Sequence, residues 1–339
     1  MNQLLDGYGR RHKDLRLSVT DRCSLRCTYC MPAQGLDWLP KDEQLTRSEL
    51  VRLVRLCTEL GIESVRITGG EPLLRPDIAD IVADIRALQR SPKISLTTNG
   101  LRLPQLAAAL AGAGLDRVNI SLDTLKPDVF IELTRRDKFA ETLAGIAAAQ
   151  QAGLQPVKIN TVLMRGVNEQ EAPELLTWAL RHGLLLRFIE QMPLDPQHGW
   201  DADEFVTQGE ILDLLRSAGF RLTPRPRTDS APATEWDVRR SPAGLGRIGA
   251  GPKRVGIVAS VSAPFCSSCD RIRVTSDGQF RTCLFSQRET DLRTPLRAGA
   301  DDEELRNVLA RAILGKGPGH GINHPDFTQP DRPMSAIGG

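Results

Sequence analysis

Three cysteines near the start of the chain have a spacing that suits an iron–sulfur cluster. Cys23, Cys27 and Cys30 lie in the run LRLSVTDRCSLRCTYCMP, directly after a short apolar stretch typical of a strand. Three thiolates can bind three irons of a 4Fe–4S cluster, and the usual fourth cysteine is missing from this run. The remaining iron would keep an open position, as a catalytic zinc ion does. We therefore predict a cluster that binds a small molecule and passes an electron to it.

A second group of three cysteines lies toward the other end of the chain: Cys266, Cys269 and Cys283. The run RIRVTSDGQFRTC predicts a β-hairpin that turns at Asp277-Gly278 and returns Cys283 to the side of the pair. By themselves these cysteines fit a second cluster or, with His320 or His324, a structural zinc site. Because the chain already carries one three-cysteine group, we favour the cluster.

Other uses of the cysteines are weaker interpretations. Three clustered cysteines cannot all pair among themselves in disulfides, and the run MNQLLDGYGRRHKDLR lacks the apolar region of a secretion signal. Thiols of this kind are expected where they stay reduced, which favours the cytoplasm. The seventh cysteine, Cys57, shares a helical stripe with Leu53 and Leu60, so we interpret it as a buried core thiol.

The composition is ordinary for a globular enzyme. The chain has 339 residues, of which 40% are hydrophobic and 25% charged, and this length allows one large domain or two. The net charge of +2 is too small to argue for nucleic acid or a membrane surface as a partner. No apolar run approaches the ~18 residues that a membrane span needs.

Six strand-like runs alternate with helical runs as far as about residue 222. The predicted strands are 15–19, 64–68, 93–99, 117–123, 156–164 and 184–190, and the predicted helices after the first are 77–88, 104–111, 140–151 and 171–182. Thr46-x-x-Glu49 is a capping box that opens the first helix, and Gly61 ends it. This alternation predicts an α/β fold with a parallel sheet. Six units are two short of a closed barrel, so we expect a partial (βα)6 barrel like an open TIM barrel.

The composition changes after residue 222. Residues 223–233, TPRPRTDSAPA, are rich in proline and polar residues and predict a linker or an exposed loop. We therefore predict two domains, the barrel at 1–222 and a C-terminal domain at 223–339. The second domain would hold the second cysteine group and cover the barrel mouth.

The residues that could do chemistry follow the predicted strands, where barrel enzymes carry their active sites. The first cysteine group follows the first strand, GGEP at 69–72 the second, and QMP at 191–193 the sixth, while TTNG at 97–100 ends the third. Cationic side chains also lie on or beside strands: Arg16, Arg66, Lys158, Arg271 and Arg273. Strand alternation puts Arg271 and Arg273 on one face. These cations either face solvent, pair with nearby acids, or bind an anion such as phosphate.

The first cysteine group, with Tyr29 before its last cysteine, resembles the signature of the radical S-adenosylmethionine (SAM) superfamily. Both cysteine groups, together with GGEP, TTNG, PVKIN, CDRIRVTSDG and the terminal MSAIGG, are similar to the GTP 3',8-cyclase family of molybdenum cofactor biosynthesis. The similarity extends from about Leu15 to Gly339, and the pairing of the two cysteine patterns with a Gly-Gly end is its most specific part. Residues 223–252 are the part that it places least well.

The resemblance implies two 4Fe–4S clusters, SAM as cofactor and GTP as substrate. The N-terminal cluster would serve to cleave SAM, and the deoxyadenosyl radical would take hydrogen from ribose C3' of GTP. The C3' carbon would then bond guanine C8, giving (8S)-3',8-cyclo-7,8-dihydroguanosine 5'-triphosphate, the first step of the pathway. The second cluster would bind the guanine.

The resemblance also implies roles for single residues. For SAM it implies that Gly70 meets the methionyl amine, Tyr29 lies by the adenine, Ser121 bonds the ligand and Met192 packs on it. For GTP it implies one hydroxyl and five cations: Thr97, Arg16, Arg66, Lys158, Arg271 and Arg273. Catalytic roles fall to Arg271 and Arg273 and to the terminal Gly338 and Gly339, which would reach into the active site.

The expected partners follow from the same resemblance. They are an electron donor of the flavodoxin or ferredoxin type and, in the pathway only, the cyclic pyranopterin monophosphate synthase; a homodimer stays open. Two rival functions remain. One is a peptide-modifying radical SAM enzyme with an auxiliary cluster, which would often carry more C-terminal cysteines. The other is a zinc-binding interaction module, which elemental analysis would separate.

Overall fold

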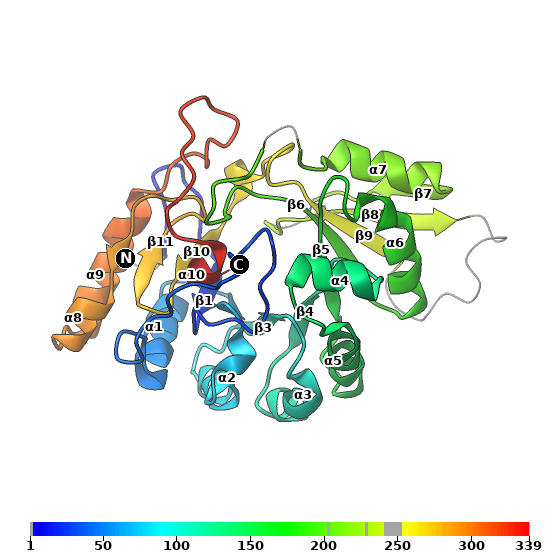
Figure 1. Ribbon diagram of the computed structural model, residues 1–339. Coiled ribbons are helices and arrows are strands. Elements are labelled where there is room, and N and C mark those ends of the chain that lie inside the picture. The colour runs from blue at the N-terminus through cyan, green and yellow to red at the C-terminus, as the bar shows by residue number, and fades with distance from the viewer. Residues whose placement is uncertain (1–2, 202–203, 228–229, 241–252, 339) are drawn as a thin grey trace.

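The centre of the molecule is a curved sheet in which six parallel strands follow one another in chain order (Figure 1). The computed structural model describes residues 3–201, 204–227, 230–240 and 253–338. The six strands are β1 (Asp14–Ser18), β2 (Ser64–Thr68), β3 (Lys93–Thr98), β4 (Arg117–Ser121), β5 (Lys158–Leu163) and β6 (Leu185–Glu190). Each agrees with a predicted strand to within a few residues at its ends, so the predicted partial barrel is confirmed.

Helices cover the outer face of this sheet (Figure 1). Those of the first part of the chain are α1 (Arg47–Glu59), α2 (Ile78–Arg86), α3 (Leu103–Gly112), α4 (Pro127–Thr134), α5 (Phe139–Gln151), α6 (Ala172–Arg181) and α7 (Gln208–Ser217), with short 3-10 turns at Pro72–Leu74 and Glu169–Glu171. The predicted capping box is present at α1, where Thr46 accepts from the Glu49 amide. Cys57 is fully buried, as predicted.

Alternation along the strands separates an apolar outer face from a polar inner face. On β1 and β2, Leu15, Leu17, Val65 and Ile67 are completely buried among the core residues that the helices cover. The intervening position Arg16 points to the other face, because successive strand side chains alternate. Apolar burial beneath the helices therefore stabilises the sheet and leaves its concave face to polar side chains.

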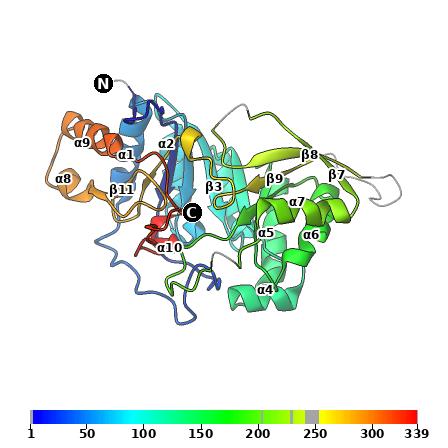
Figure 2. The same ribbon diagram turned by 90° about the horizontal axis from the view of Figure 1, so that it is seen from above.

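The remaining strands extend the same sheet at both ends. They are β7 (Phe220–Pro224), β8 (Thr234–Arg240), β9 (Arg254–Val258), β10 (Arg271–Val274), β11 (Gln279–Arg281) and β12 (Thr290–Asp291). In parallel pairs, β9 lies beside β6 and β10 lies beside β1. The later part of the chain thus adds strands to both ends of the predicted six, as Figure 2 shows from above.

Two sequence predictions need adjustment: the linker after residue 222 and the set of helices. The linker predicted at 223–233 is wrong at its start, because Thr223 and Pro224 end strand β7. β7 is the last strand of the sheet, and an edge strand tolerates proline because one side of it makes no ladder hydrogen bonds. Five helices were not predicted: α4, α7, α8 (Arg293–Arg297), α9 (Asp302–Leu314) and α10 (Met334–Ile337). Asp301-x-x-Glu304 caps α9. Residues 241–252, which belong to the part that the resemblance places least well, lie outside the described residues.

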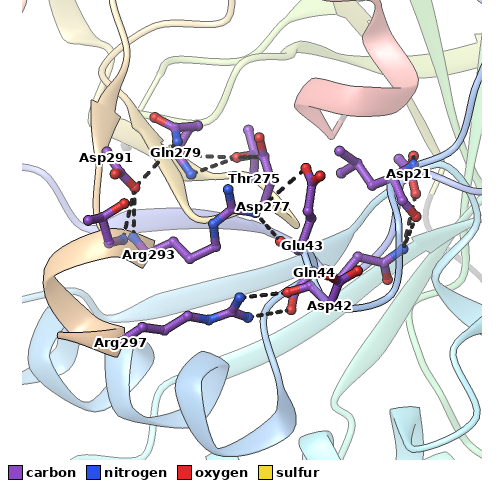
Figure 3. A network of polar contacts seen from close by, with 12 residues as sticks. Asp21, Asp42, Glu43, Gln44, Thr275, Asp277, Gln279, Asp291, Arg293 and Arg297 are labelled. Atoms are coloured by element: carbon purple, nitrogen blue, oxygen red, sulfur yellow. Dashed lines mark hydrogen bonds and ion pairs between the residues drawn. The ribbon is translucent and has the colours of Figure 1, made fainter. Parts of the chain in front are cut away.

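The hairpin predicted at Asp277-Gly278 is confirmed by the antiparallel pairing of β10 with β11. Polar contacts join it and α8 to the segment that follows the first cysteine group (Figure 3). Arg297 donates to the carbonyls of Asp42 and Gln44, and Arg293 donates to the carbonyl of Glu43. These contacts tie the loop after the first strand to the part of the chain that carries the second cysteine group.

We predict that Gly145→Ala destabilises the fold, whereas Gly112→Ala does not. A Cβ at Gly145 of α5 would lie 2.1 Å from the Gly100 carbonyl oxygen, so a helix or the loop after β3 must shift. Such overpacking costs about 1–3 kcal/mol. Gly112, at the end of α3, has open space around it, and alanine there should stabilise the helix by about 0.4–1 kcal/mol. Midpoints of chemical denaturation measure both; equal midpoints for the two variants would contradict the packing argument.

Candidate active site

A cavity opens on the concave face of the sheet, and residues from both halves of the chain line it. Its walls contain these predicted site residues: Arg16, Arg66, Thr97, Met192, Cys266, Cys269, Arg271, Arg273 and Cys283. Of the residues predicted for GTP, only Lys158 is not in the wall. Of those predicted for SAM, Met192 is in it, whereas Tyr29, Gly70 and Ser121 are not, and the N-terminal cysteines also lie outside it. Ser121 pairs in register with Asn160, which does line the cavity, so it lies one strand position away. Burial lowers the pKa of Lys158 to about 7, and the charges of Arg187, Arg117 and Arg66 lower it further.

Three arginines from neighbouring strands lie side by side on this face. In the sheet register, Arg16 of β1 is opposite both Arg66 of β2 and Arg273 of β10. Partners in register point to the same face of a sheet, so their guanidinium groups gather in one place. Arg16 and Arg273 are 4% and 5% exposed. The prediction that Arg271 and Arg273 share a face is also confirmed, since both line the cavity.

The positive charge of this group is only partly compensated. Burial lowers the pKa of Arg273 to about 9, and the charges of Arg16 and Arg271 act in the same direction. Burial and then Arg16 hold the pKa of Arg66 well below its usual value, while Asp14 opposes the shift. Asp14 lies 3.0 Å from Arg16 as an ion pair. Buried like charges of this kind favour binding of a polyanion, which would compensate their positive charge.

The C-terminal cysteine triad, Cys266, Cys269 and Cys283, lies in the wall of the same cavity. Burial raises the pKa of Cys266, and the nearby sulfurs of Cys283 and Cys269 raise it further. Burial also acts to raise the pKa of Cys269, but the charges of Arg271 and Lys316 outweigh it and lower that pKa. The hairpin has therefore returned Cys283 to the pair, as predicted, and the nearby cations favour the thiolate of Cys269.

The N-terminal triad, Cys23, Cys27 and Cys30, lies on the loop after β1. Burial and, after it, the charge of Cys23 raise the pKa of Cys30 to about 12, so these two sulfurs lie close to one another. Among the residues that the structure describes, no three His, Cys, Asp or Glu side chains are arranged to hold a single metal ion. A cluster binds each thiolate to a different iron and so spreads its ligands more widely.

The histidines considered as zinc ligands differ in position. His320 lines the cavity beside the C-terminal triad, and its ring lies tilted against that of Phe285 with centroids 5.0 Å apart. His324 is 66% exposed and faces Asp326 instead. Its Nδ1 accepts from the Asp326 amide.

The glycines of the GGEP loop are needed for close backbone contact. The Gly70 amide donates to the Thr20 carbonyl at 2.8 Å, and a Cβ at Gly70 would lie 2.3 Å from the Asp21 carbonyl oxygen. Gly69 has a φ of +156° and a similar contact with Thr20. Only glycine fits this approach, so the loop after β2 holds the backbone just before the N-terminal triad.

Tyr29 is fixed inside the barrel by a carboxylate. Its hydroxyl donates to Asp123 Oδ2 at 2.8 Å, and the Val162 amide donates to Asp123 Oδ1. Burial raises the pKa of Asp123 to about 6, although both hydrogen bonds lower it. Tyr29 lies on the cysteine loop, and this hydrogen bond ties that loop to the segment just after β4.

The C-terminal tail reaches into the site from the outside. The Ser335 amide of α10 bonds to the sulfur of Cys30, and Met334 lines the cavity. Arg273 donates to the Gly338 carbonyl. A Cβ at Gly338 would lie 2.6 Å from Thr68 Oγ1. The tail therefore contacts both the N-terminal triad and the arginines, while Gly339 lies outside the described residues.

Sequence reasoning missed one arginine that the structure brings into the wall. Arg187 of β6 is 5% exposed, lines the cavity and donates to Asn119 Oδ1 at 2.6 Å. It is opposite Asn160 in the β5–β6 register, so its side chain faces inward. The signal was available in the sequence, because one arginine interrupts the otherwise apolar run LLLRFI. Lys316 beside Cys269 is a second residue without a sequence signal.

Comparison with known proteins agrees with this arrangement of two cysteine triads on a partial barrel. Residues 17–179 match the family model of the Radical SAM superfamily, and residues 184–322 match that of Molybdenum Cofactor Synthesis C. The fold resembles the crystal structure of Streptococcus suis SuiB bound to S-adenosylmethionine, with a TM-score of 0.58 and 14% identity over 96% of this chain and 77% of that one. The fold and the first triad thus define a radical SAM protein.

Proteins of similar sequence identify one family within this superfamily. The chain is 57% identical to the GTP 3',8-cyclase of Streptomyces coelicolor, over 99% of this chain and 96% of the relative. It is 53% identical to that of Mycolicibacterium smegmatis, over 99% and 92%. The chain belongs to the GTP 3',8-cyclase family. Within the described residues, no helix is long and apolar enough to cross a membrane.

We predict that Cys23→Ala and Cys283→Ala each remove about half of the iron and acid-labile sulfide of the anaerobically reconstituted protein, because each takes one ligand from a different cluster. Cys57→Ala is the matched control. Cys57 is equally a free cysteine, but it lies in the core of α1 and should leave the metal content unchanged. Full iron content in Cys283→Ala would show that the C-terminal triad holds no cluster.

Proposed function

We propose that this chain is a radical SAM enzyme that converts GTP into (8S)-3',8-cyclo-7,8-dihydroguanosine 5'-triphosphate, the first step of molybdenum cofactor biosynthesis. The observation that carries the proposal is the cavity that joins a partly uncompensated arginine group to the C-terminal cysteine triad. A nucleoside triphosphate offers a polyanion for the first and a purine base for the second. The names of the relatives at 57% and 53% identity support the same substrate.

Two 4Fe–4S clusters would be held by the two triads, the first by Cys23, Cys27 and Cys30 on the loop after β1. When bound, this cluster supplies the electron that generates a radical from SAM. The chain's own share is placement of the two ligands, exclusion of water and charge matching. The second triad would hold the cluster that faces the guanine, because it is the one in the cavity wall.

The triphosphate would bind the arginine group. Arg16, Arg66 and Arg273 lie together by register, and Arg271 and Thr97 complete the wall around them. Guanidinium groups make paired hydrogen bonds to phosphate oxygens. Lys158 would assist by its charge from β5, two residues before Asn160 of the cavity wall. Because its pKa is lowered, a bound phosphate would favour its protonated form.

SAM would lie beside the first triad, on the side of the tail. Tyr29 belongs to that loop, Gly70 contacts the backbone just before it, and Met192 reaches the cavity from the segment after β6. Ser121 at the end of β4 would contribute a hydroxyl from the strand end. In this position the reacting carbon of SAM would face the ribose of GTP.

The C-terminal tail would complete the site. Arg273 holds the Gly338 carbonyl, and Gly338 packs against Thr68 where no side chain fits. The tail thereby orients Arg273, and Gly339 beyond it would approach the reacting atoms. Arg271 and Arg273 are the other residues that we assign to catalysis.

Several broader features belong to the same proposal. An external donor of the flavodoxin or ferredoxin type would reduce the first cluster, and the product would pass to a cyclic pyranopterin monophosphate synthase. A cytoplasmic location fits a chain with reduced thiols. The division into domains at 1–222 and 223–339 stays a prediction, and the matched families meet between residues 179 and 184.

The direct test is product analysis. The anaerobically reconstituted protein is incubated with SAM, dithionite and GTP, and we expect 5'-deoxyadenosine together with a GTP isomer of unchanged mass. Deoxyadenosine with no GTP product would keep a radical SAM enzyme and reject GTP as substrate. Neither product, with iron and sulfide present, would overturn the proposed chemistry.

We predict that Arg271→Ala weakens GTP binding about 10- to 100-fold, because a charged hydrogen bond to phosphate contributes about 1.5–3 kcal/mol. The loss should shrink as ionic strength rises, since salt screens the remaining attraction. Arg225→Ala is the control, because Arg225 is 44% exposed and pairs with Asp237 away from the cavity. Calorimetry on the cluster-loaded protein measures both variants, and wild-type affinity in Arg271→Ala would remove this residue from the site.

A further inference from the structure

A short segment after α9 wraps the C-terminal cysteine triad. Lys316 Nζ lies 3.8 Å from Cys269 Sγ, and the His320 amide bonds to the sulfur of Cys266. Between them, a Cβ at Gly319 would lie 3.5 Å from the same Cys266 Sγ. Residues 316–320 therefore contact two of the three sulfurs, and we call them the flanking segment.

Lys316 brings a buried positive charge to this triad. The residue is only 4% exposed, and its Nζ donates to the Arg271 carbonyl at 2.7 Å as well as to Cys269. The sulfur of Cys283 also lies within electrostatic reach of the ammonium group. A buried ammonium group is unfavourable without an anionic partner. The thiolates of the triad are such partners, so the lysine belongs to this site.

Arg10, from the N-terminal segment of the chain, holds the flanking segment in place. Its guanidinium group donates to the carbonyls of Gly317 at 2.5 Å, Pro318 at 3.0 Å and Cys266 at 2.8 Å. Its Nε is fixed in turn by Asp6 Oδ2 at 2.6 Å. One arginine thus joins the segment that carries Lys316 to the backbone of a cysteine ligand.

We propose that Lys316 raises the reduction potential of the C-terminal cluster and that Arg10 is the positioning residue that keeps Lys316 beside Cys269. Reduction adds a negative charge to a cluster already bound by thiolates. A fixed ammonium group with a hydrogen bond to a ligand sulfur stabilises the reduced form more than the oxidised one. The inference rests on the C-terminal cluster of the proposed function.

The test is a potentiometric titration of the full-length reconstituted enzyme, followed by electron paramagnetic resonance of the reduced clusters. The N-terminal ligands Cys23, Cys27 and Cys30 are replaced by alanine in every sample, so that only the C-terminal cluster remains. Lys316→Met removes charge and hydrogen bonds, whereas Lys316→Gln keeps a donor without the charge. Lys13→Met is the matched control, because Lys13 is 49% exposed and pairs with Glu63.

We expect the midpoint potential to shift to more negative values in Lys316→Met and in Lys316→Gln, and to stay unchanged in Lys13→Met. Lys316→Arg, which keeps the charge, should restore most of the wild-type potential. An unchanged potential in Lys316→Met with full iron content would overturn the proposal. Loss of the cluster in both uncharged variants would also overturn it, because Lys316 would then act in cluster assembly. If the parent sample contains no iron and gives no signal, the failure lies in the proposed C-terminal cluster itself.

The positioning role of Arg10 has its own outcome. Arg10→Met should shift the midpoint potential in the same direction as Lys316→Met, and the double variant should shift it no further than Lys316→Met alone. A full additional shift in the double variant would show that Arg10 does not act through Lys316. Arg216→Met controls for the loss of an arginine, because Arg216 is 54% exposed and pairs only locally with Asp213 on α7.

Discussion

The concentration of arginine on the concave face of the sheet is the constraint on which the rest of the structure depends. Arg16, Arg66 and Arg273 face one another by register, and each has its pKa lowered by burial. Such a group opposes folding unless other interactions offset it. The apolar outer face, packed beneath α1, α2, α3 and α5, provides that offset. A site built for a polyanion is therefore maintained at the expense of the stability of the empty fold.

The later part of the chain places its contributions around these arginines. Strand β10 brings Arg271 and Arg273 beside β1, and the hairpin that follows brings Cys283 to Cys266 and Cys269 in the same wall. The tail bonds to both regions, since Ser335 reaches the first triad and Gly338 reaches Arg273. Sheet extension at β10 thus brings the C-terminal triad into the cavity wall, and the tail connects the arginines of that wall to the N-terminal triad.

The sequence was sufficient for the parts of this site that depend on local spacing. The triads, the hairpin and the six strands follow from patterns a few residues long. The inward direction of Arg187 depends on β5–β6 register, and the place of Lys316 depends on Arg10, some three hundred residues earlier in the chain. Contacts of such sequence separation leave no periodic signal, and neither does the addition of β9 and β10 to the two ends of the six-stranded sheet. The eight-residue helix α4 was missed because so short a stretch has little periodicity.

Anomalous diffraction at the iron edge, from crystals grown anaerobically with SAM and GTP, tests the central claim most directly. The account predicts two iron clusters, one on each cysteine triad, with the triphosphate on Arg16, Arg66 and Arg273 in the cavity between them. The guanine should face the C-terminal cluster, and SAM should lie on the first. A single cluster, or a nucleotide bound away from the arginine group, would contradict it.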